Sequence, residues 1–559
     1  MSDLQRQFEE NNTAPASLFD AVIVGAGFSG LYMLHRLREL GLAVQVYEAG
    51  SGIGGTWFWN RYPGARCDVE SMDYAYSFSE QLAQEWEWTE KYPSQPEILR
   101  YLEHVADRFD LRQSIQLKTR VTAAVFNEAT NRWEIRTDTG DHVSAKFCIM
   151  ATGCLSAAKL PDIEGLESFK GSWYHTATWP REGVDFTGQR VGVIGTGSSG
   201  VQCIPLIAEQ AARLCVFQRT PSFSVPARNA PMEPEFLRHR RSNSAEYRRK
   251  ARESSFGSHY EIGGPSALLA TPEQRQLEYE TRWKNGGASF LLSFADLLVN
   301  KDANDTAAQF LRSKIREQVH EPAVAEALMP TDHAVGTKRL CVDTNYYATF
   351  NRENVTLVDL KKSPIEEITS KGIRTQDAEY ELDSIVFATG FDAMTGALLG
   401  IDIRGKAGQT LKQKWSEGPR TYLGLMMAGF PNLFTITGPG SPSVLSNMIV
   451  SIEQHVEWIG DCINHLRGRE VDRIEATAEA EEAWFAHVNQ VANYTLFSQT
   501  NSWYMGANVP GKPRVFMPYV GGVKAYRMKC EEVASKGYEG FELAGPHSTS
   551  LAAVASTGT

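Results

Sequence analysis

The sequence predicts an α/β fold with two Rossmann-like, doubly wound dinucleotide-binding domains and an α-helical insertion. Two glycine-rich loops, Gly25-Ala26-Gly27-Phe28-Ser29-Gly30 and Gly195-Thr196-Gly197-Ser198-Ser199-Gly200, each follow a short apolar run and precede a helical pattern. Between residues 225 and 330 the composition changes to charged, helix-forming residues with weak strand signals. The repeated strand, glycine loop and helix therefore predict two nucleotide sites, with the helices inserted in the second domain.

The first unit ends in an acid. Residues 21–24 form an apolar run typical of a buried parallel strand, and leucines then recur at helical spacing from residue 31 to residue 40. The glycines permit a tight turn and a close approach to a pyrophosphate at the helix N-terminus. Glu48 ends the next strand, where a carboxylate accepts hydrogen bonds from ribose hydroxyls and repels a 2′-phosphate. This unit therefore predicts FAD or NAD.

The second unit ends in a cation. Residues 191–194 and 214–217 predict its two strands, and Arg219 and Thr220 follow the second strand. A guanidinium and a hydroxyl at this point suit a 2′-phosphate, which predicts NADPH. The competing interpretation of Arg219 is an ordinary surface arginine. Two different dinucleotides in one chain imply hydride transfer from a nicotinamide to a flavin.

Composition argues against several other classes of protein. The chain has 56 basic and 67 acidic residues and a formal net charge of −11, which disfavours general binding to nucleic acid or to an anionic membrane. The basic runs 238–241 and 248–250 would allow nucleic-acid binding, but the interleaved Glu246 and Glu253 favour a solvated helix face. Because neither a signal peptide nor a membrane-spanning apolar run is visible, we expect a cytoplasmic monomer or weak homo-oligomer.

The cysteines limit the route that electrons take from the flavin. The eight cysteines include no C-x-x-C pair, so neither a redox dithiol nor a zinc ribbon is predicted, and no H-E-x-x-H spacing indicates a metal. Oxygen is then a leading electron acceptor. The loop 54–68 agrees with this, since its glycines and tryptophans can approach a flat ring system and exclude water from a reactive oxygen adduct.

Four charged or titratable residues are candidates for the chemistry. Asp68 ends the loop just described, and Lys338 and Arg339 lie where the helical insertion returns to the nucleotide fold. Two adjacent cations can divide between a cofactor phosphate and a reaction centre. A solvated turn acid and ordinary surface cations remain the alternatives. His175 alone is more often a structural histidine than a catalyst, because no Ser or Cys nucleophile motif accompanies it.

Two segments resemble the fingerprints of the type I Baeyer–Villiger monooxygenases. Phe169, Gly171, His175 and Trp179 match one fingerprint, and the loop from Gly54 through Trp57 to Asp68 is similar to the second. The resemblance covers residues 20–540. It is strongest to the phenylacetone and steroid monooxygenase group, on the segments 438–448 and 502–511, which look like that group's substrate loop and its cofactor-covering loop. The residues 332–335 depart from the phenylacetone-type pattern and look more like steroid-type members.

The resemblance implies roles for individual residues. Arg339 is implied to be the catalytic cation that stabilises a flavin C4a-peroxide anion and then the tetrahedral adduct, with Asp68 paired to it. His175 and its fingerprint neighbours Phe169, Gly171 and Trp179 are implied to couple the domains. The substrate pocket is expected at Ser443, Val444 and Leu445. The residues expected to bind the two cofactors are Gly25, Gly27, Phe28, Ser29, Gly30, Glu48, Gly55, Thr56, Trp57, Asp68, Tyr74, Gly195, Thr196, Gly197, Ser198, Ser199, Gly200, Gln202, Arg219, Thr220, Lys338, Arg339 and Trp503.

The implied activity is that of an FAD-dependent, NADPH- and O2-consuming monooxygenase. It inserts one oxygen beside a ketone carbonyl to give an ester or lactone, and sulfide oxidation is a second expected activity. A flavin N- or S-monooxygenase and a non-catalytic NADP(H)-sensing protein are the alternatives. The expected domains are FAD binding (1–155 and 389–545), NADP binding (156–224 and 331–388), a helical insertion (225–330) and a disordered tail (546–559).

Overall fold

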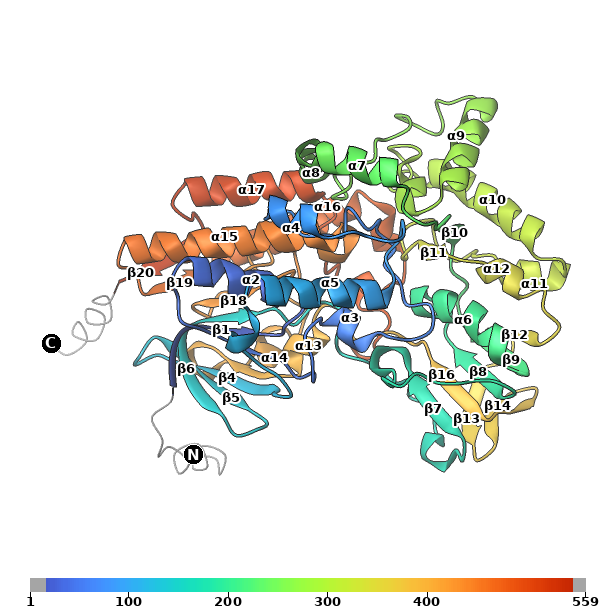
Figure 1. The fold of residues 1–559 in the computed structure, drawn as a ribbon, viewed down its shortest axis with the longest axis horizontal. Helices are drawn as coiled ribbons and strands as arrows, with labels where there is room; N and C mark the ends of the chain where they lie inside the picture. Colours follow the sequence, from blue (N-terminus) through green and yellow to red (C-terminus); the bar gives the residue numbers. More distant parts are fainter. Residues whose placement is uncertain (1–16, 546–559) are drawn as a thin grey trace, which may run out of the picture.

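The fold of residues 17–545, which the computed structural model describes, contains two α/β sheets side by side (Figure 1). The larger sheet has the strand order β17-β4-β5-β6-β1-β2-β3, and β18 also pairs with β6. The neighbours of β1 run parallel to it, as a doubly wound sheet requires. Its strands are β1 (Ser17–Val24), β2 (Val44–Tyr47), β3 (Ile115–Gln116), β4 (Val121–Asn127), β5 (Arg132–Thr137), β6 (His142–Met150), β17 (Asp402–Arg404) and β18 (Leu433–Thr435).

The first βαβ unit forms as its sequence pattern predicts. The apolar end of β1, residues 21–24, is buried, and the leucines of α2 (Phe28–Glu39) at residues 31, 34 and 37 are fully buried against the sheet. Gly41 follows with φ +73°, a left-handed conformation that glycine adopts readily. The strand begins at Ser17, four residues before the apolar run 21–24 that predicted it. Residues 1–16 and the predicted tail 546–559 lie outside the described residues.

The second sheet is entirely parallel, with the order β12-β9-β8-β16-β7. The fingerprint segment supplies its edge strand β7, in which His175 pairs with Phe387 of β16. The segment expected to be a linker is therefore also part of the nucleotide fold. The elements of this unit are β7 (Ser172–His175), β8 (Arg190–Ile194), α6 (Ser198–Gln210), β9 (Arg213–Gln218), α12 (Tyr346–Thr349), β12 (Val355–Asp359), β16 (Ser384–Phe387) and the side hairpins β13 (Ile365–Thr369), β14 (Gly372–Thr375) and β15 (Glu379–Glu381).

The predicted helical insertion is present. A parallel strand pair closes its base, β10 (Ser224–Pro226) with β11 (Cys341–Asp343). These three-residue strands are too short to show a period in the sequence. The helices of the insertion are α7 (Pro234–Ser242), α8 (Ser244–Glu253), α9 (Pro272–Asn285), α10 (Lys301–Gln318) and α11 (Pro322–Ala327).

The C-terminal part returns to the first sheet. Helix α15 (Met448–Gly468) lies beside α2, and α17 packs on α15 (Figure 1). The remaining elements are α3 (Thr56–Trp59), α4 (Glu80–Glu85), α5 (Gln95–Arg108), α13 (Gly396–Leu399), α14 (Leu411–Lys414), α16 (Ala478–Asn493), α17 (Val523–Ser535), β19 (Arg473–Ala476) and β20 (Phe541–Ala544). The two α/β units and the inserted helices confirm the predicted fold class.

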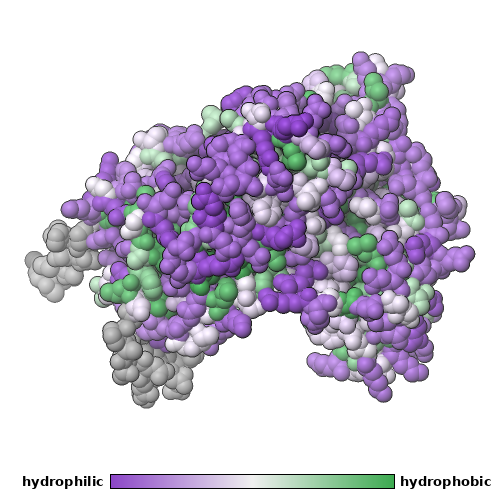
Figure 2. All heavy atoms as spheres, viewed as in Figure 1, coloured by the Kyte–Doolittle hydropathy of each residue, from purple (hydrophilic) through white to green (hydrophobic). Residues whose placement is uncertain are grey.

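The surface drawn in Figure 2 is mostly hydrophilic, with a notch in its lower edge between the two α/β units. From residue 17 to residue 545, no helix has the length and apolar character to cross a membrane. The basic runs of α7 and α8 differ in part from a solvated face. Arg249 and Lys250 pair with Glu253 and Glu246 on the surface, but Arg240 is 4% exposed and pairs with Asp73.

Candidate active site

The two glycine loops have the same backbone environment. Gly25 has φ +105°, and a Cβ there would lie 2.6 Å from the carbonyl oxygen of Ala151. Gly195 has φ +109°, and a Cβ there would lie 2.4 Å from the carbonyl oxygen of Ala388. Each loop thus packs on an Ala-Thr-Gly turn at the carboxyl end of a neighbouring strand, and only glycine fits this approach. The turns at 151–153 and 388–390 therefore support the two loops.

Close backbone contacts extend the first cradle. The backbones of Gly27 and Gly55 touch, since a Cβ on Gly55 would lie 2.9 Å from Cα of Gly27. Phe28 and Ser29, which follow Gly27 in the first glycine loop, begin helix α2, so free amide donors of the helix N-terminus point toward this cradle. Ser198 and Ser199 open α6 in the same way. Both cradles therefore have the shape and the donors that a dinucleotide pyrophosphate requires.

Glu48 orders the first loop. Its Oε2 accepts a hydrogen bond from the amide of Ala26 at 2.8 Å, and its Oε1 accepts one from the amide of Gly50 at 2.7 Å. Each carboxylate oxygen has a second lone pair available for a ribose hydroxyl. The acid expected to bind ribose therefore also holds the loop that surrounds it.

The remaining residues expected near the flavin form an aromatic and polar wall. The indole Nε1 of Trp57 donates to the Tyr74 hydroxyl at 3.2 Å, and both side chains are buried. Gln202 accepts from the Tyr62 hydroxyl at 2.8 Å and donates to the carbonyl of Arg66 at 3.0 Å. Because α6 carries Gln202, this residue joins the two nucleotide units in addition to any contact with a cofactor.

Cations gather at the carboxyl end of the second sheet. Burial lowers the pKa of Lys338, and the positive charges of Arg219 and Lys361 lower it further. Like charges held together are stabilised by an anion placed between them. Lys361 was not predicted from the sequence, although β12 lies parallel to β9 and places residues 359 and 218 opposite each other. Arg219 follows β9 and Lys361 follows β12, so pairing of these two strands would have indicated that the two cations lie at the same edge of the sheet.

The residues that depart from the phenylacetone-type pattern form a compact pair. Nδ1 of His333 lies 2.7 Å from Oδ1 of Asp332, and Lys361 Nζ lies 3.0 Å from Oδ2. Burial opposes ionisation of Asp332, but these two hydrogen bonds outweigh it and lower the pKa of Asp332 to about 2. Burial also lowers the pKa of His333. Asp332 therefore remains an anion that holds Lys361 at the edge of the cation group.

Arg339 is the most constrained cation of the site. Its Nε and Nη2 each donate to Asp68 at 2.8 Å, and its Nη1 donates to the carbonyl of Val444 at 2.9 Å. The charge of Asp68 raises the pKa of Arg339 above its usual value despite burial. The Arg339 side chain as a whole keeps 36% of its surface accessible. It is therefore a fixed positive charge with a face open to the cavity beside it.

A cavity that opens to solvent adjoins Arg339 and Asp68, and its free space, open solvent included, is about 930 Å³. Val444 and Leu445, two of the three residues expected in the substrate pocket, line this cavity. Ser443 departs from this expectation, because its hydroxyl lies 3.0 Å from Sγ of Cys154 in the interior and does not line the cavity. The cavity is predominantly apolar, and its apolar and aromatic lining comprises Val69, Tyr92, Phe256, Tyr260, Leu291, Leu292, Leu298, Leu340, Val444, Leu445, Phe497 and Tyr504.

Tyr504 is a site residue that sequence reasoning missed. It is 2% exposed and lines the cavity with Arg339. Burial raises the pKa of Tyr504 to about 12, although the nearby charge of Arg339 lowers it. Trp503 packs on its ring with a centroid distance of 4.2 Å. The position of Trp503 in the predicted cofactor loop was the only sequence signal for this neighbour.

His175 has a structural environment. Its Nδ1 accepts from the amide of Ala177 at 3.0 Å, so Nε2 carries the proton toward the carbonyl of Lys159 at 3.2 Å. Burial lowers the pKa of His175, which favours this neutral form. Around it, Phe169 and Trp179 are buried, and a Cβ on Gly171 would lie 2.3 Å from the carbonyl oxygen of Asp383. The fingerprint thus docks β7 and leaves no free nitrogen for acid–base chemistry.

Comparisons with known proteins agree with this geometry. The model of the pyridine nucleotide-disulphide oxidoreductase family matches residues 22–242. All eight cysteines are buried and free, so the matched region holds no disulfide. Acetone monooxygenase (methyl acetate-forming) of Gordonia sp. is 45% identical over 527 residues, covering 94% of this chain and 99% of the relative.

Two further relatives extend the match. A Baeyer–Villiger monooxygenase of Pseudooceanicola batsensis is 43% identical over 533 residues, covering 95% of this chain and 97% of the relative. The solved structure of oxidized steroid monooxygenase bound to NADP is 54% identical, with a TM-score of 0.91, and covers 94% of this chain and 100% of that chain. These matches span nearly the whole sequence and confirm the resemblance seen in its fingerprints. The chain therefore belongs to the Baeyer–Villiger monooxygenase family of flavin-dependent enzymes.

Proposed function

We propose that this enzyme uses FAD, NADPH and O2 to insert one oxygen atom beside a ketone carbonyl, giving an ester or lactone and water. The observation that carries the proposal is Arg339, a permanently charged guanidinium held by Asp68 at the wall of an apolar cavity. A fixed cation in a water-poor site stabilises negative charge that develops on an oxygen. The ketone carbonyl acquires such a charge when it becomes tetrahedral.

The chain's own residues bind and orient the reactants. The cradle around Gly25, Gly27 and Gly55 would hold FAD, and the loop 195–200 with Arg219, Lys338 and Lys361 would hold NADPH through its 2′-phosphate. When bound, the flavin supplies the oxygen-activating chemistry through a C4a-peroxide. Arg339 holds the developing anion, Tyr504 and Asp68 position Arg339, and the apolar wall excludes water.

We extend this proposal to the organisation of the chain. The FAD-binding unit would comprise residues 1–155 and 389–545, and the NADP-binding unit residues 156–224 and 331–388, with residues 225–330 inserted between the two parts of the latter. Gln202 and Arg339 bridge these units through Tyr62 and Asp68. Relative motion of the units would then change the placement of the two cofactors through a small number of contacts.

Sulfide oxidation is a second activity that we propose for the same cavity. A sulfide needs no stabilisation of a tetrahedral oxyanion, so its oxidation depends less on Arg339 than ester formation does. The different dependence on Arg339 therefore distinguishes oxygen transfer to a sulfide from oxygen insertion beside a ketone in the same protein.

Product analysis tests the proposal. Purified enzyme would be incubated with NADPH, isotopically labelled O2 and a panel of methyl, aryl and cyclic ketones, with an aryl sulfide assayed beside them. We expect esters or lactones that carry one labelled oxygen, and release of FAD on denaturation. Oxidation of the sulfide without ester from any ketone would overturn the ketone assignment, and a protein that retains no flavin would overturn the cofactor assignment.

A further inference from the structure

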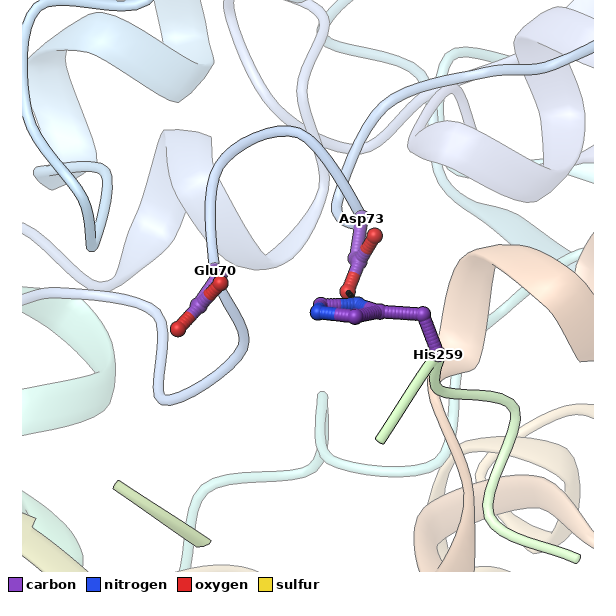
Figure 3. A group of neighbouring side chains, drawn as sticks. All are labelled: Glu70, Asp73 and His259. Carbon is purple, nitrogen blue, oxygen red and sulfur yellow. Dashed lines mark hydrogen bonds and ion pairs between the residues drawn. The ribbon is translucent and has the colours of Figure 1, made fainter. Parts of the chain in front are cut away.

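The wall of the cavity becomes acidic beyond Asp68. Glu70 and Asp73 lie on the same loop as Asp68, and both line the cavity with Arg339. Glu70 is 9% exposed, and the side chain of Asp73 is 8% exposed. Figure 3 shows these two carboxylates on one loop, with His259 reaching toward them from the inserted segment. The cavity is therefore lined by these two carboxylates as well as by the guanidinium of Arg339.

These acids already have cationic neighbours in the protein. Asp73 pairs with Arg240 and lies 2.7 Å from Nδ1 of His259, while Lys91 Nζ lies 3.3 Å from Glu70. Glu70, Asp73 and His259 place potential metal-ligating atoms within 4.8 Å of one another. Because Arg240 and Lys91 balance the two carboxylates, the cluster does not require a metal ion. Burial opposes ionisation of Asp73, but His259 and Arg240 outweigh it and lower the pKa of Asp73.

The hydrogen bonds around Glu70 decide what it can bind. The Tyr260 hydroxyl donates to Oε1 of Glu70, and burial together with the charge of Glu70 raises the pKa of Tyr260. Tyr260 therefore keeps its proton and directs it at the carboxylate. Oε1 also faces Lys91, which leaves Oε2 as an acceptor. Oε2 of Glu70 is therefore a hydrogen-bond acceptor in the wall of the cavity, and Arg339 is a charged donor in the same wall.

We propose that Glu70 recognises a hydroxyl group on the ketone substrate, which donates its proton to the carboxylate while the carbonyl oxygen faces Arg339. This inference rests on the proposed ketone oxidation and names a substrate class for it, the hydroxyketones with an apolar skeleton. The carboxylate favours a substrate group that donates a hydrogen bond over one that can only accept. A hydroxyl can donate to Glu70, but an ether or a second carbonyl at the same position can only accept.

The wild-type enzyme gives the first test. Methyl ketones of increasing chain length would be compared in three matched forms that end in a methyl, a hydroxyl or a methoxy group. We expect kcat/KM for the hydroxyl form to exceed that for the methoxy form by about tenfold at the chain length that lets the carbonyl reach Arg339 and the hydroxyl reach Glu70, since the acceptor is charged. Equal values for hydroxyl and methoxy forms at every length would overturn the proposal, and would point to donation from the neighbouring Tyr92 hydroxyl.

A variant assigns the preference to Glu70. In Glu70→Gln the amide oxygen can still accept from Tyr260, but the amide nitrogen presents a donor in place of an acceptor. We expect the hydroxyl-to-methoxy ratio to fall about tenfold, toward one. Glu87→Gln is the matched control, because Glu87 is exposed, pairs with Arg241 and does not line the cavity. A wild-type ratio in a flavin-loaded Glu70→Gln enzyme would remove Glu70 from substrate recognition.

The two proposals fail separately in this design. Ester from the methyl-terminated ketones without hydroxyl preference would retain the proposed function and reject the role of Glu70. Absence of ester from all three forms, in a protein that is reduced by NADPH, would reject the proposed function itself. The flavin absorbance of each variant reports whether the protein has folded and bound its cofactor.

Discussion

Asp68 holds Arg339 through both of its carboxylate oxygens, with Nε and Nη2 of the guanidinium each at 2.8 Å. The two residues are separated by 271 positions in the chain. Such a bidentate pair fixes the plane of the guanidinium as well as its place. The third nitrogen donates to the Val444 carbonyl, so Arg339 is tied to the loop after β18 that lines the cavity.

Replacing Arg339 by alanine should separate the two half-reactions. We expect Arg339→Ala to be reduced by NADPH but to form ester about a thousandfold more slowly, because a preorganised oxyanion donor is lost. Stopped-flow flavin absorbance would follow reduction, and gas chromatography would quantify ester. Arg339→Lys is the control that keeps the charge without the fork. Ester formation by Arg339→Ala at the wild-type rate would contradict the assigned role.

Replacing Asp68 by asparagine should have a smaller effect on both half-reactions. The amide keeps the size of the side chain but removes the charge and one of the two acceptors that orient Arg339. We expect both half-reactions to slow by about ten- to a hundredfold, the range for groups that orient a catalytic residue. Asp110→Asn changes an exposed acid and serves as the control. The prediction fails if stopped-flow traces and steady-state turnover of Asp68→Asn match those of the wild type.

Removing either exposed cation of the second sheet should weaken the binding of NADPH but not that of NADH. For Arg219→Ala and Lys361→Ala we expect the KM for NADPH to rise about tenfold, because each loses a charge-assisted contact to a phosphate. The KM for NADH should change little. Arg213→Ala is the matched control, since Arg213 is exposed at the opposite end of the same strand, β9. An undiminished preference of Arg219→Ala for NADPH would exclude Arg219 from the phosphate site.

The sequence predicted the parts of the fold whose signals are local. Glycine spacing, apolar runs and strand-ending residues are all contained within about thirty positions, so both βαβ units were predicted. The first residues of β1 and the strand β7 were not predicted, because strand pairing decides whether polar residues such as Ser172 become part of a sheet. The short strands of β10 and β11 likewise depend on a partner more than a hundred positions away.

The candidate site divides in the same way. The sequence identified Asp68 as the end of the loop 54–68 and Arg339 as one of two adjacent cations, and the structure brings the two residues together. Lys361, Tyr504 and Glu70 were not predicted, since no motif distinguishes this lysine, this tyrosine or this glutamate from the others in the chain. Their place in the site comes from packing between distant segments, which spacing along the sequence does not encode. Ser443 shows the converse, because the loop was identified but the direction of one side chain was not.

Replacing Gly55 by a residue with a side chain should prevent flavin binding. Gly55 has φ +53°, and an added Cβ would lie 2.9 Å from Cα of Gly27, so Gly55→Ala must separate the two loops of the cradle. We expect purified Gly55→Ala to have lost most of its flavin absorbance. Gly140→Ala is the control, since Gly140 has φ +92° but nothing within 4 Å of its added Cβ. That control should retain flavin with a stability loss of about 1 kcal/mol. Full flavin occupancy in Gly55→Ala would contradict the cradle.

His455 should make the enzyme less stable in acid. Its side chain is fully buried, Nδ1 accepts from the Thr437 amide at 2.8 Å, and Nε2 lies 2.9 Å from the Tyr526 hydroxyl. Burial, with the nearby charge of Arg527, lowers the pKa of His455 to about 3. An unfolded chain protonates this residue near its ordinary pKa of about 6.5.

Stability should therefore be complete above about pH 6.5 and fall as the pH drops toward 3, because only the unfolded state binds the proton in that interval. Between pH 7.5 and pH 5 this one residue should account for about 2 kcal/mol. Chemical unfolding of the wild type and His455→Gln at both pH values measures the difference, with the exposed His320→Gln as the control. We expect His455→Gln to be less stable at pH 7.5 but to lose less on acidification, and an equal acid loss in variant and wild type would show that His455 does not cause it.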